Sequence, residues 1–71
     1  MINKADKKKI IDDFLLMQGF ERLARDQYLK MAEDPFVWQA GIQNEFKLIS
    51  QEEDNHARIV GTIIELIEKK L

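Results

Sequence analysis

One pair of side chains has the spacing of a metal site. Glu53 and His56 form a Glu-x-x-His pattern, and on a helix two residues three apart project from the same face. One metal ion could then bind a carboxylate oxygen and an imidazole nitrogen from a single turn. The pattern alone is weak, because the chain has 7 Glu among 71 residues. Taken alone, the only His would more often be a hydrogen-bonded core histidine.

The surrounding residues place this pair within a regular apolar pattern. In the second half of the chain the pattern runs through Ile42, Phe46, Ile49, Glu53, His56, Val60, Ile63 and Ile67. In the first half it runs through Ile10, Phe14, Met17, Glu21, Ala24, Tyr28 and Met31. The spacing alternates between three and four residues, which predicts one amphipathic helix from each half. Both stripes are apolar except near their centres, where the polar residues lie.

The boundaries of these helices are marked by capping residues. Asp34 is a good N-cap and Pro35 is tolerated at a first helical position, so one helix should end where the next begins. Asn3 with Asp6 resembles a capping arrangement at the start of the chain. We therefore expect a helix over residues 4–32 and a second over residues 35–70, with Gly41 a possible break after a short first turn.

The carboxylates on the two stripes need a compensating partner. Removing a carboxylate from water costs several kcal/mol unless an opposite charge or hydrogen bonds compensate. Neither stripe contains a Lys or Arg. Glu21 and Glu53 therefore require a cation or a shared proton.

Size and composition limit the kind of protein. A chain of 71 residues is one domain at most, and chains this short rarely build a sufficient core without disulfides, a metal or oligomerisation. With no Cys there is no disulfide and no Cys-ligated zinc or iron–sulfur site.

The net charge of −2 argues against nucleic-acid binding. We found no signal peptide or apolar stretch long enough for a membrane span, and expect a cytoplasmic protein.

Pairing of two such hairpins would assemble a complete ligand set. A helical hairpin buries only one face well, so a homodimer should form a four-helix bundle. The dimer would combine two Glu21 with two Glu53-x-x-His56 pairs. This matches the di-iron and di-manganese sites of ferritin-like bundles, with a Glu from each of two helices and Glu-x-x-His from each of the other two. Carboxylate and imidazole ligands suit Fe or Mn, and Zn would also bind.

Two segments resemble the helix motifs of one family. The run Glu21-Arg22-Leu23-Ala24-Arg25-Asp26-Gln27-Tyr28 resembles the first-helix motif of rubrerythrins, and Glu52-Glu53-Asp54-Asn55-His56-Ala57 resembles the second. The second run is also similar to that of encapsulated ferritins, which are single hairpins with a di-iron site at a subunit interface. The resemblance covers roughly residues 10 to 70. It implies an all-α, ferritin-like half-bundle with Glu21, Glu53 and His56 as metal ligands and Tyr28 beside the metals.

The implied function is oxidation of Fe(II) by dioxygen or peroxide at a di-iron site shared between two subunits. Such an activity would serve iron or peroxide detoxification. The catalytic residues would be Glu21, Glu53, His56 and Tyr28. The alternative is a non-enzymatic helical interaction module, in which the metal is structural or absent and the same side chains hydrogen-bond across the interface. The width of the apolar surface also indicates a homodimer or a larger homo-oligomer.

Overall fold

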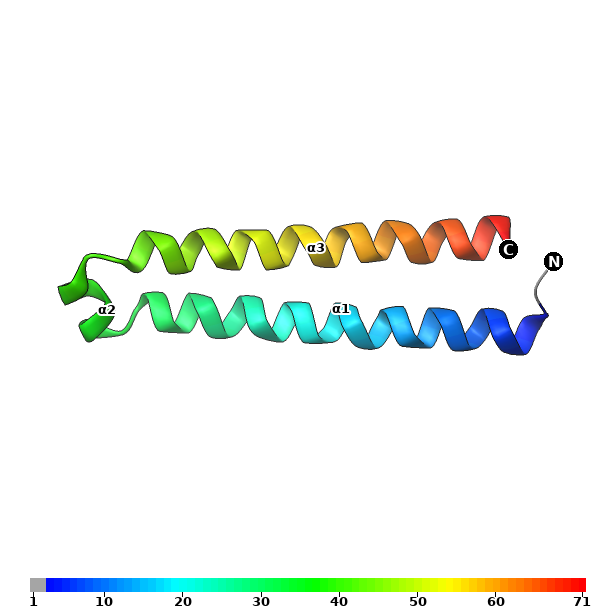
Figure 1. Cartoon of the computed structure of the whole chain (residues 1–71), viewed down its shortest axis with the longest axis horizontal. Coiled ribbons are helices and arrows are strands. Elements are labelled where there is room, and N and C mark those ends of the chain that lie inside the picture. The colour runs from blue at the N-terminus through cyan, green and yellow to red at the C-terminus, as the bar shows by residue number, and fades with distance from the viewer. Residues whose placement is uncertain (1–2) are drawn as a thin grey trace.

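The computed structural model describes residues 3–71, and it contains three helices there. These are α1 (Lys4–Ala32), α2 (Pro35–Ala40) and α3 (Gln43–Lys70). Helices α1 and α3 lie side by side and run antiparallel, and α2 closes one end of the hairpin (Figure 1). No strand is present in the described part of the chain. The prediction of an all-α helical hairpin is confirmed.

The helices begin where the capping residues predicted. The Asn3 side chain accepts a hydrogen bond of 2.8 Å from the backbone N–H of Asp6, which satisfies one of the free donors of the first turn of α1. The Asp34 side chain accepts a 2.8 Å bond from the N–H of Phe36, and Pro35 follows at the first position of α2. The bounds of α1 match the predicted helix over residues 4–32.

The predicted helix over residues 35–70 is wrong as a continuous element. Gly41 adopts the left-handed conformation, with φ of 71°, and ends α2. Glycine reaches this region without the steric penalty that a Cβ imposes. The chain then turns at Ile42 and starts α3 in a new direction. The possible break at Gly41 is therefore the actual boundary between two helices.

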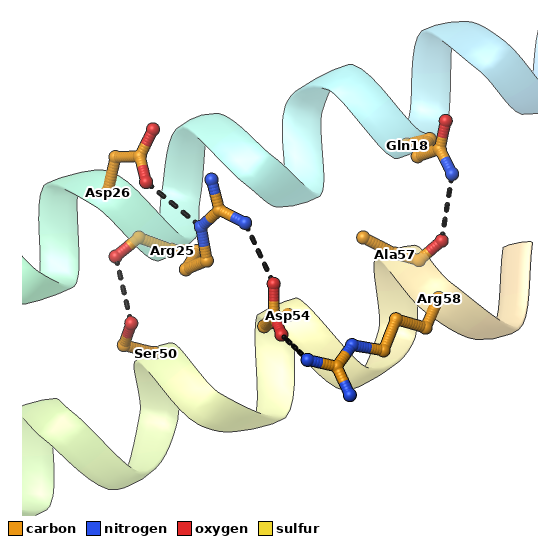
Figure 2. Close-up of polar contacts among 7 residues, drawn as sticks. All are labelled: Gln18, Arg25, Asp26, Ser50, Asp54, Ala57 and Arg58. Atoms are coloured by element: carbon orange, nitrogen blue, oxygen red, sulfur yellow. Dashed lines mark hydrogen bonds and ion pairs between the residues drawn. The ribbon is translucent and has the colours of Figure 1, made fainter. Parts of the chain in front are cut away.

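Cross-helix hydrogen bonds fix the register of α1 against α3. The amide nitrogen Nε2 of Gln18 donates to the Ala57 carbonyl at 2.9 Å, and the Ser50 hydroxyl donates to the Arg25 carbonyl at 3.1 Å (Figure 2). Near the closed end, the rings of Tyr28 and Phe46 lie 6.3 Å apart. At the open end, Lys7 Nζ donates to the Glu68 carbonyl at 2.8 Å.

The residues that face across this seam form two heptad rows on each helix. They are Ile11, Gln18, Arg25 and Ala32 with Phe14, Glu21 and Tyr28 on α1, and Gln43, Ser50, Ala57 and Ile64 with Phe46, Glu53, Val60 and Ile67 on α3. All of them are buried or half-buried. Small side chains such as Ser50 and Ala57, both about 2% exposed, let the two backbones approach closely. The seam therefore combines apolar contacts with side-chain bonds to backbone carbonyls.

Each predicted stripe combines one of these rows with a row outside the seam. The outer rows are Ile10, Met17, Ala24 and Met31 on α1, and Ile42, Ile49, His56 and Ile63 at and along α3. Because the helices are antiparallel, both outer rows follow the same side of the hairpin. We call this side the apolar flank; Phe20, Ile59 and Leu66 border it. Met17, Met31, Ile42 and His56 are exposed there, so the other helix of the hairpin covers only part of each predicted stripe.

The hairpin has an elongated shape with a large surface. Its extents are 55 × 15 × 10 Å and its radius of gyration is 16.4 Å, against about 11 Å for a compact chain of this length. The accessible surface is 5629 Å², against roughly 4,600 Å² for a compact monomer of this mass. None of the helices within residues 3–71 combines the length and the apolar character that crossing a membrane requires.

Candidate metal site between the helices

Glu21 and Glu53 occupy facing positions at the centre of the seam. Glu21 lies one heptad before Tyr28, and Glu53 lies one heptad after Phe46, so the register that joins the two rings places the two glutamates opposite each other. The bond from Gln18 to Ala57 lies on one side of this level and the bond from Ser50 to Arg25 lies on the other. Both glutamates are half-buried.

One oxygen of Glu21 is buried without a partner. Its Oε2 atom has almost no contact with solvent and makes no hydrogen bond in the structure. A buried polar atom of this kind costs about 1–3 kcal/mol, and more when it carries charge. The donor that this oxygen lacks is therefore a cation, a proton or a group supplied from outside the chain.

The arginine one helical turn after Glu21 does not supply that donor. Arg25 lies one helical turn after Glu21, but its NH1 nitrogen donates to Asp54 Oδ1 at 2.7 Å and its Nε nitrogen donates to Asp26 Oδ1 at 2.9 Å (Figure 2). These hydrogen bonds raise the pKa of Arg25, and the bond that Arg25 donates to Asp26 has the largest effect. The Asp54 carboxylate also forms an ion pair at 3.0 Å with Arg58, one turn later on α3. The basic side chains in Figure 2 are thus committed to aspartates rather than to Glu21.

The structure places His56 on the apolar flank rather than between the helices. His56 belongs to the apolar flank and is exposed in the single chain. Within residues 3–71, no three His, Cys, Asp or Glu side chains are close enough to hold one metal ion. A single hairpin therefore brings Glu21 and Glu53 to one level of the seam, and it leaves His56 exposed on the apolar flank.

Tyr28 lies on the same row as Glu21, seven residues later. Its ring is half-buried and tilted by 40° to the ring of Phe46. The two aromatic residues form the apolar layer next to the glutamates, toward the closed end of the hairpin. A low-polarity layer there limits the access of water to Glu21 and Glu53 from that side.

The ion pairs of Arg25, Asp54 and Arg58 are the polar cluster that the stripe analysis missed. The side chains of this cluster and that of Ser50 line an open groove of about 380 Å³. The groove lies on the side of the hairpin away from the apolar flank. The hydrogen bond from Arg25 is the main cause that lowers the pKa of Asp54 below its ordinary value. An acidic residue four positions before a basic one, as in Asp54 and Arg58, is a sequence signal for such a pair. The bond from Arg25 across to α3 has no local signal.

Comparisons with protein-family models, with curated proteins and with solved structures found no match for this chain.

Proposed function

We propose that two copies of this chain pair through their apolar flanks into a ferritin-like four-helix bundle that binds iron and oxidises Fe(II). Glu21, Glu53 and His56 from each copy would hold the metal ions. The observation that carries this proposal is the buried, unpartnered oxygen of Glu21 opposite Glu53. A cation bound between these carboxylates would supply the missing partner, since no Lys or Arg occupies either predicted stripe.

The placement of His56 fits a site that is shared between copies. In a four-helix bundle, the centre lies between the seam rows and the outer rows of each helix. Glu21 and Glu53 are on the seam rows and His56 is on an adjacent outer row, so all three side chains would border that centre. A second hairpin over the flank would cover His56 and bring a second set of the same residues to it.

The exposed surface of the single chain is large enough for such an interface. The flank and its border carry several large apolar side chains that are about half exposed, with Phe20 at 61% and Ile59 at 50%. The accessible surface exceeds that expected for a compact monomer by roughly 1,000 Å². A standard interface buries about 800 Å² on each partner. One second copy of the hairpin is therefore a sufficient occupant.

The ligand chemistry suits iron in both oxidation states. Carboxylate oxygens and imidazole nitrogens bind Fe and Mn, and they also accept Zn. The chemistry supplied at the site would be oxidation of Fe(II) to Fe(III) by dioxygen or peroxide. Glu21 and Glu53 would offset the positive charge of the ions, and the Tyr28 layer would restrict water. We expect this activity in the cytoplasm, a reducing compartment, where it would protect against free iron or peroxide.

The test is an anaerobic titration with Fe(II), followed by exposure to air under an absorbance monitor. We expect about one iron bound per chain, the ratio of a two-metal site shared by two chains. Air should then produce a ferric absorbance band. Glu53→Ala should abolish both the binding and the band, and Glu52→Ala, which removes the neighbouring exposed carboxylate, should retain them.

A helical interaction module is the second candidate, and the exposure of His56 favours it. In that case the apolar flank pairs two chains and the glutamates share a proton. Thermal unfolding of the parent and of His56→Ala, each with and without a chelator, separates the cases. A metal held by His56 makes the parent lose stability with chelator, whereas a metal-free module gives the same melting temperature in both buffers. Iron binding that survives Glu53→Ala would overturn the iron proposal.

A further inference from the structure

Two side chains on α1 have the spacing to donate a hydrogen bond to Glu21, and both are engaged elsewhere. Gln18 lies three residues before Glu21 and Arg25 lies four residues after it, and these spacings bring side chains together on a helix surface. Gln18 Nε2 donates instead to the Ala57 carbonyl at 2.9 Å, and Arg25 donates to two aspartates (Figure 2). The buried Oε2 atom of Glu21 therefore has no donor, although two candidates lie on its own helix.

Pairing with Arg25 would be the ordinary outcome for Glu21. A glutamate four residues before a basic residue is the favourable order for an ion pair along a helix. A guanidinium group also suits a carboxylate because it can donate two parallel hydrogen bonds. Such a pair would recover the stability that the unpartnered oxygen of Glu21 costs. A specific contact must therefore keep the guanidinium group of Arg25 away from Glu21.

Asp54 supplies this contact from the other helix. Its Oδ1 atom accepts from Arg25 Nη1 at 2.7 Å, and its Oδ2 atom lies 3.0 Å from Arg58 Nη2, so both oxygens are engaged (Figure 2). Asp26 has the larger effect on the pKa of Arg25, but it belongs to α1 and its side chain is 61% exposed, against 32% for Asp54. Exposed ion pairs contribute little because water competes for both charges. Asp54 is therefore the partner that draws the guanidinium group across to α3.

Gln18 is engaged by α3 as well, and a glycine makes room for it. A Cβ built on Gly61 would lie 3.2 Å from Gln18 Nε2, which is tighter than an ordinary contact. The missing side chain lets the Gln18 amide reach the Ala57 carbonyl. Both candidate donors on α1 are thus directed away from Glu21 by residues of α3.

We propose that Asp54 is a positioning residue that holds Arg25 away from Glu21 and so keeps this carboxylate available to a metal ion. The inference rests on the proposed function, because it gives the unpartnered carboxylate the role of an iron ligand. Without Asp54, Arg25 would pair with Glu21, and an incoming metal ion would have to displace the guanidinium group. Asp54 acts through Arg25 and does not bind the metal itself.

Four chains test this inference through their affinity for Zn(II): the parent, Asp54→Asn, Arg25→Gln and the double variant. Zn(II) has no redox chemistry, so titration against a chelating indicator at one protein concentration measures binding alone. We expect Asp54→Asn to weaken binding about tenfold or more, the usual effect of losing a residue that supports a metal ligand. Arg25→Gln should change the affinity of the parent little, and it should restore the affinity of Asp54→Asn.

The matched control is Asp26→Asn, which removes the other aspartate of Arg25 and leaves the bond to α3 in place. Its affinity for Zn(II) should stay close to that of the parent. If the bond only fixed the helix register, Arg25→Gln and Asp54→Asn would weaken binding equally. If only net charge mattered, Arg25→Gln would have the same effect in both backgrounds. Either result would overturn the proposal.

Thermal unfolding with chelator tests the position of Arg25 without any metal, and so separates this inference from the iron proposal. Glu21→Gln should raise the melting temperature of the parent but not that of Asp54→Asn, in which Arg25 already pairs with Glu21. An equal rise in both backgrounds would overturn the inference even if the parent binds iron. A rise confined to the parent supports it, and if that parent binds no metal, the iron proposal alone fails.

Discussion

At the scale of single residues, the side chain that sets this hairpin apart is Glu21. It lies on a helix seam in a half-buried position, with one oxygen that has almost no contact with solvent and no hydrogen bond within the chain. A structural carboxylate on a seam normally pairs with a basic residue, and Arg25 is one turn away. Arg25 binds Asp26 and Asp54 instead. The arrangement leaves an oxygen of Glu21 without a hydrogen-bond donor in the single chain, which costs stability.

Replacing the Glu21 carboxylate with an amide of the same shape should remove this loss of stability. In metal-free buffer with chelator, we expect Glu21→Gln to raise the free energy of unfolding by about 1 kcal/mol, because a neutral amide loses less on burial than a carboxylate. For a chain of this length the melting temperature would rise by roughly 4–8 °C. With Fe(II) present the order should invert, since the parent alone binds the ion.

The control for this experiment is Glu52→Gln, which makes the same chemical change at an exposed position. Its melting temperature should stay close to that of the parent in both buffers. A Glu21→Gln protein that is less stable than the parent without metal would show that the Glu21 carboxylate already has a stabilising partner.

At the scale of helices, the Arg25–Asp54 bond is an ion pair that links α1 and α3. It lies one residue from Glu53 and one turn from Glu21, so it helps to hold the register that brings the two glutamates to one level. The pKa of Asp54 lies below the ordinary value of 3.8, with the bond from Arg25 as the main cause. A group whose pKa is lowered by folding stabilises the protein above its unfolded pKa, and this contribution is lost as the pH falls through its folded pKa.

Acidification should therefore reveal this link. Between about pH 5 and pH 2, we expect the parent to lose more stability than Asp54→Asn, because the amide has no proton to gain and its contribution does not change. Urea unfolding at a series of pH values, followed by circular dichroism, measures the difference. Asp12→Asn removes an exposed carboxylate that pairs with Lys8 within α1 and serves as the control. Equal acid sensitivity of Asp54→Asn and the parent would rule out a stabilising role for the bond.

Helix existence and boundaries were accessible from the sequence because caps and periodicity are local signals. Asn3 and the Asp34-Pro35 pair mark helix starts through their own backbone bonds. The continuous helix over 35–70 was wrong because the break depends on a positive φ at Gly41. Glycine permits that conformation without requiring it.

The sequence predicted only one of the two rows that each helix contributes to the seam, for a different reason. On each helix, the row that contains the glutamate has a neighbouring row on either side. One neighbour is the second row of the seam and the other is the outer row. The hydrophobic pattern selected the outer row because its residues are mostly apolar. The true second rows contain Gln18, Arg25, Gln43 and Ser50, whose polar side chains hide them from such a pattern. Two side-chain hydrogen bonds to backbone carbonyls join these rows across the seam. No rule of residue spacing predicts such bonds. The glutamates were identified because they interrupt the apolar residues around them.

At the scale of the whole molecule, the proposed site would be divided between two copies, so its activity should depend on their association. Within residues 3–71 no three potential metal ligands come together in one chain. We therefore expect the rate of Fe(II) oxidation per chain to rise with protein concentration until the dimer is saturated. Parallel sedimentation measurements give the dissociation curve, and the two curves should coincide. A rate per chain that stays constant across the dissociation of the oligomer would place a complete site within the monomer.

The antiparallel register also sets the length of the loop that each contact between α1 and α3 closes during folding. Contacts near the turn join residues close in sequence, with Tyr28 and Phe46 18 positions apart, whereas Lys7 and Glu68 at the open end are separated by 61. Loop-closure entropy scales with the logarithm of loop length, so closing the far end first costs only about 1 kcal/mol more than closing the near end. Folding that starts at the turn is therefore favoured by about sixfold. In this favoured order, the central glutamates meet after the aromatic pair has closed.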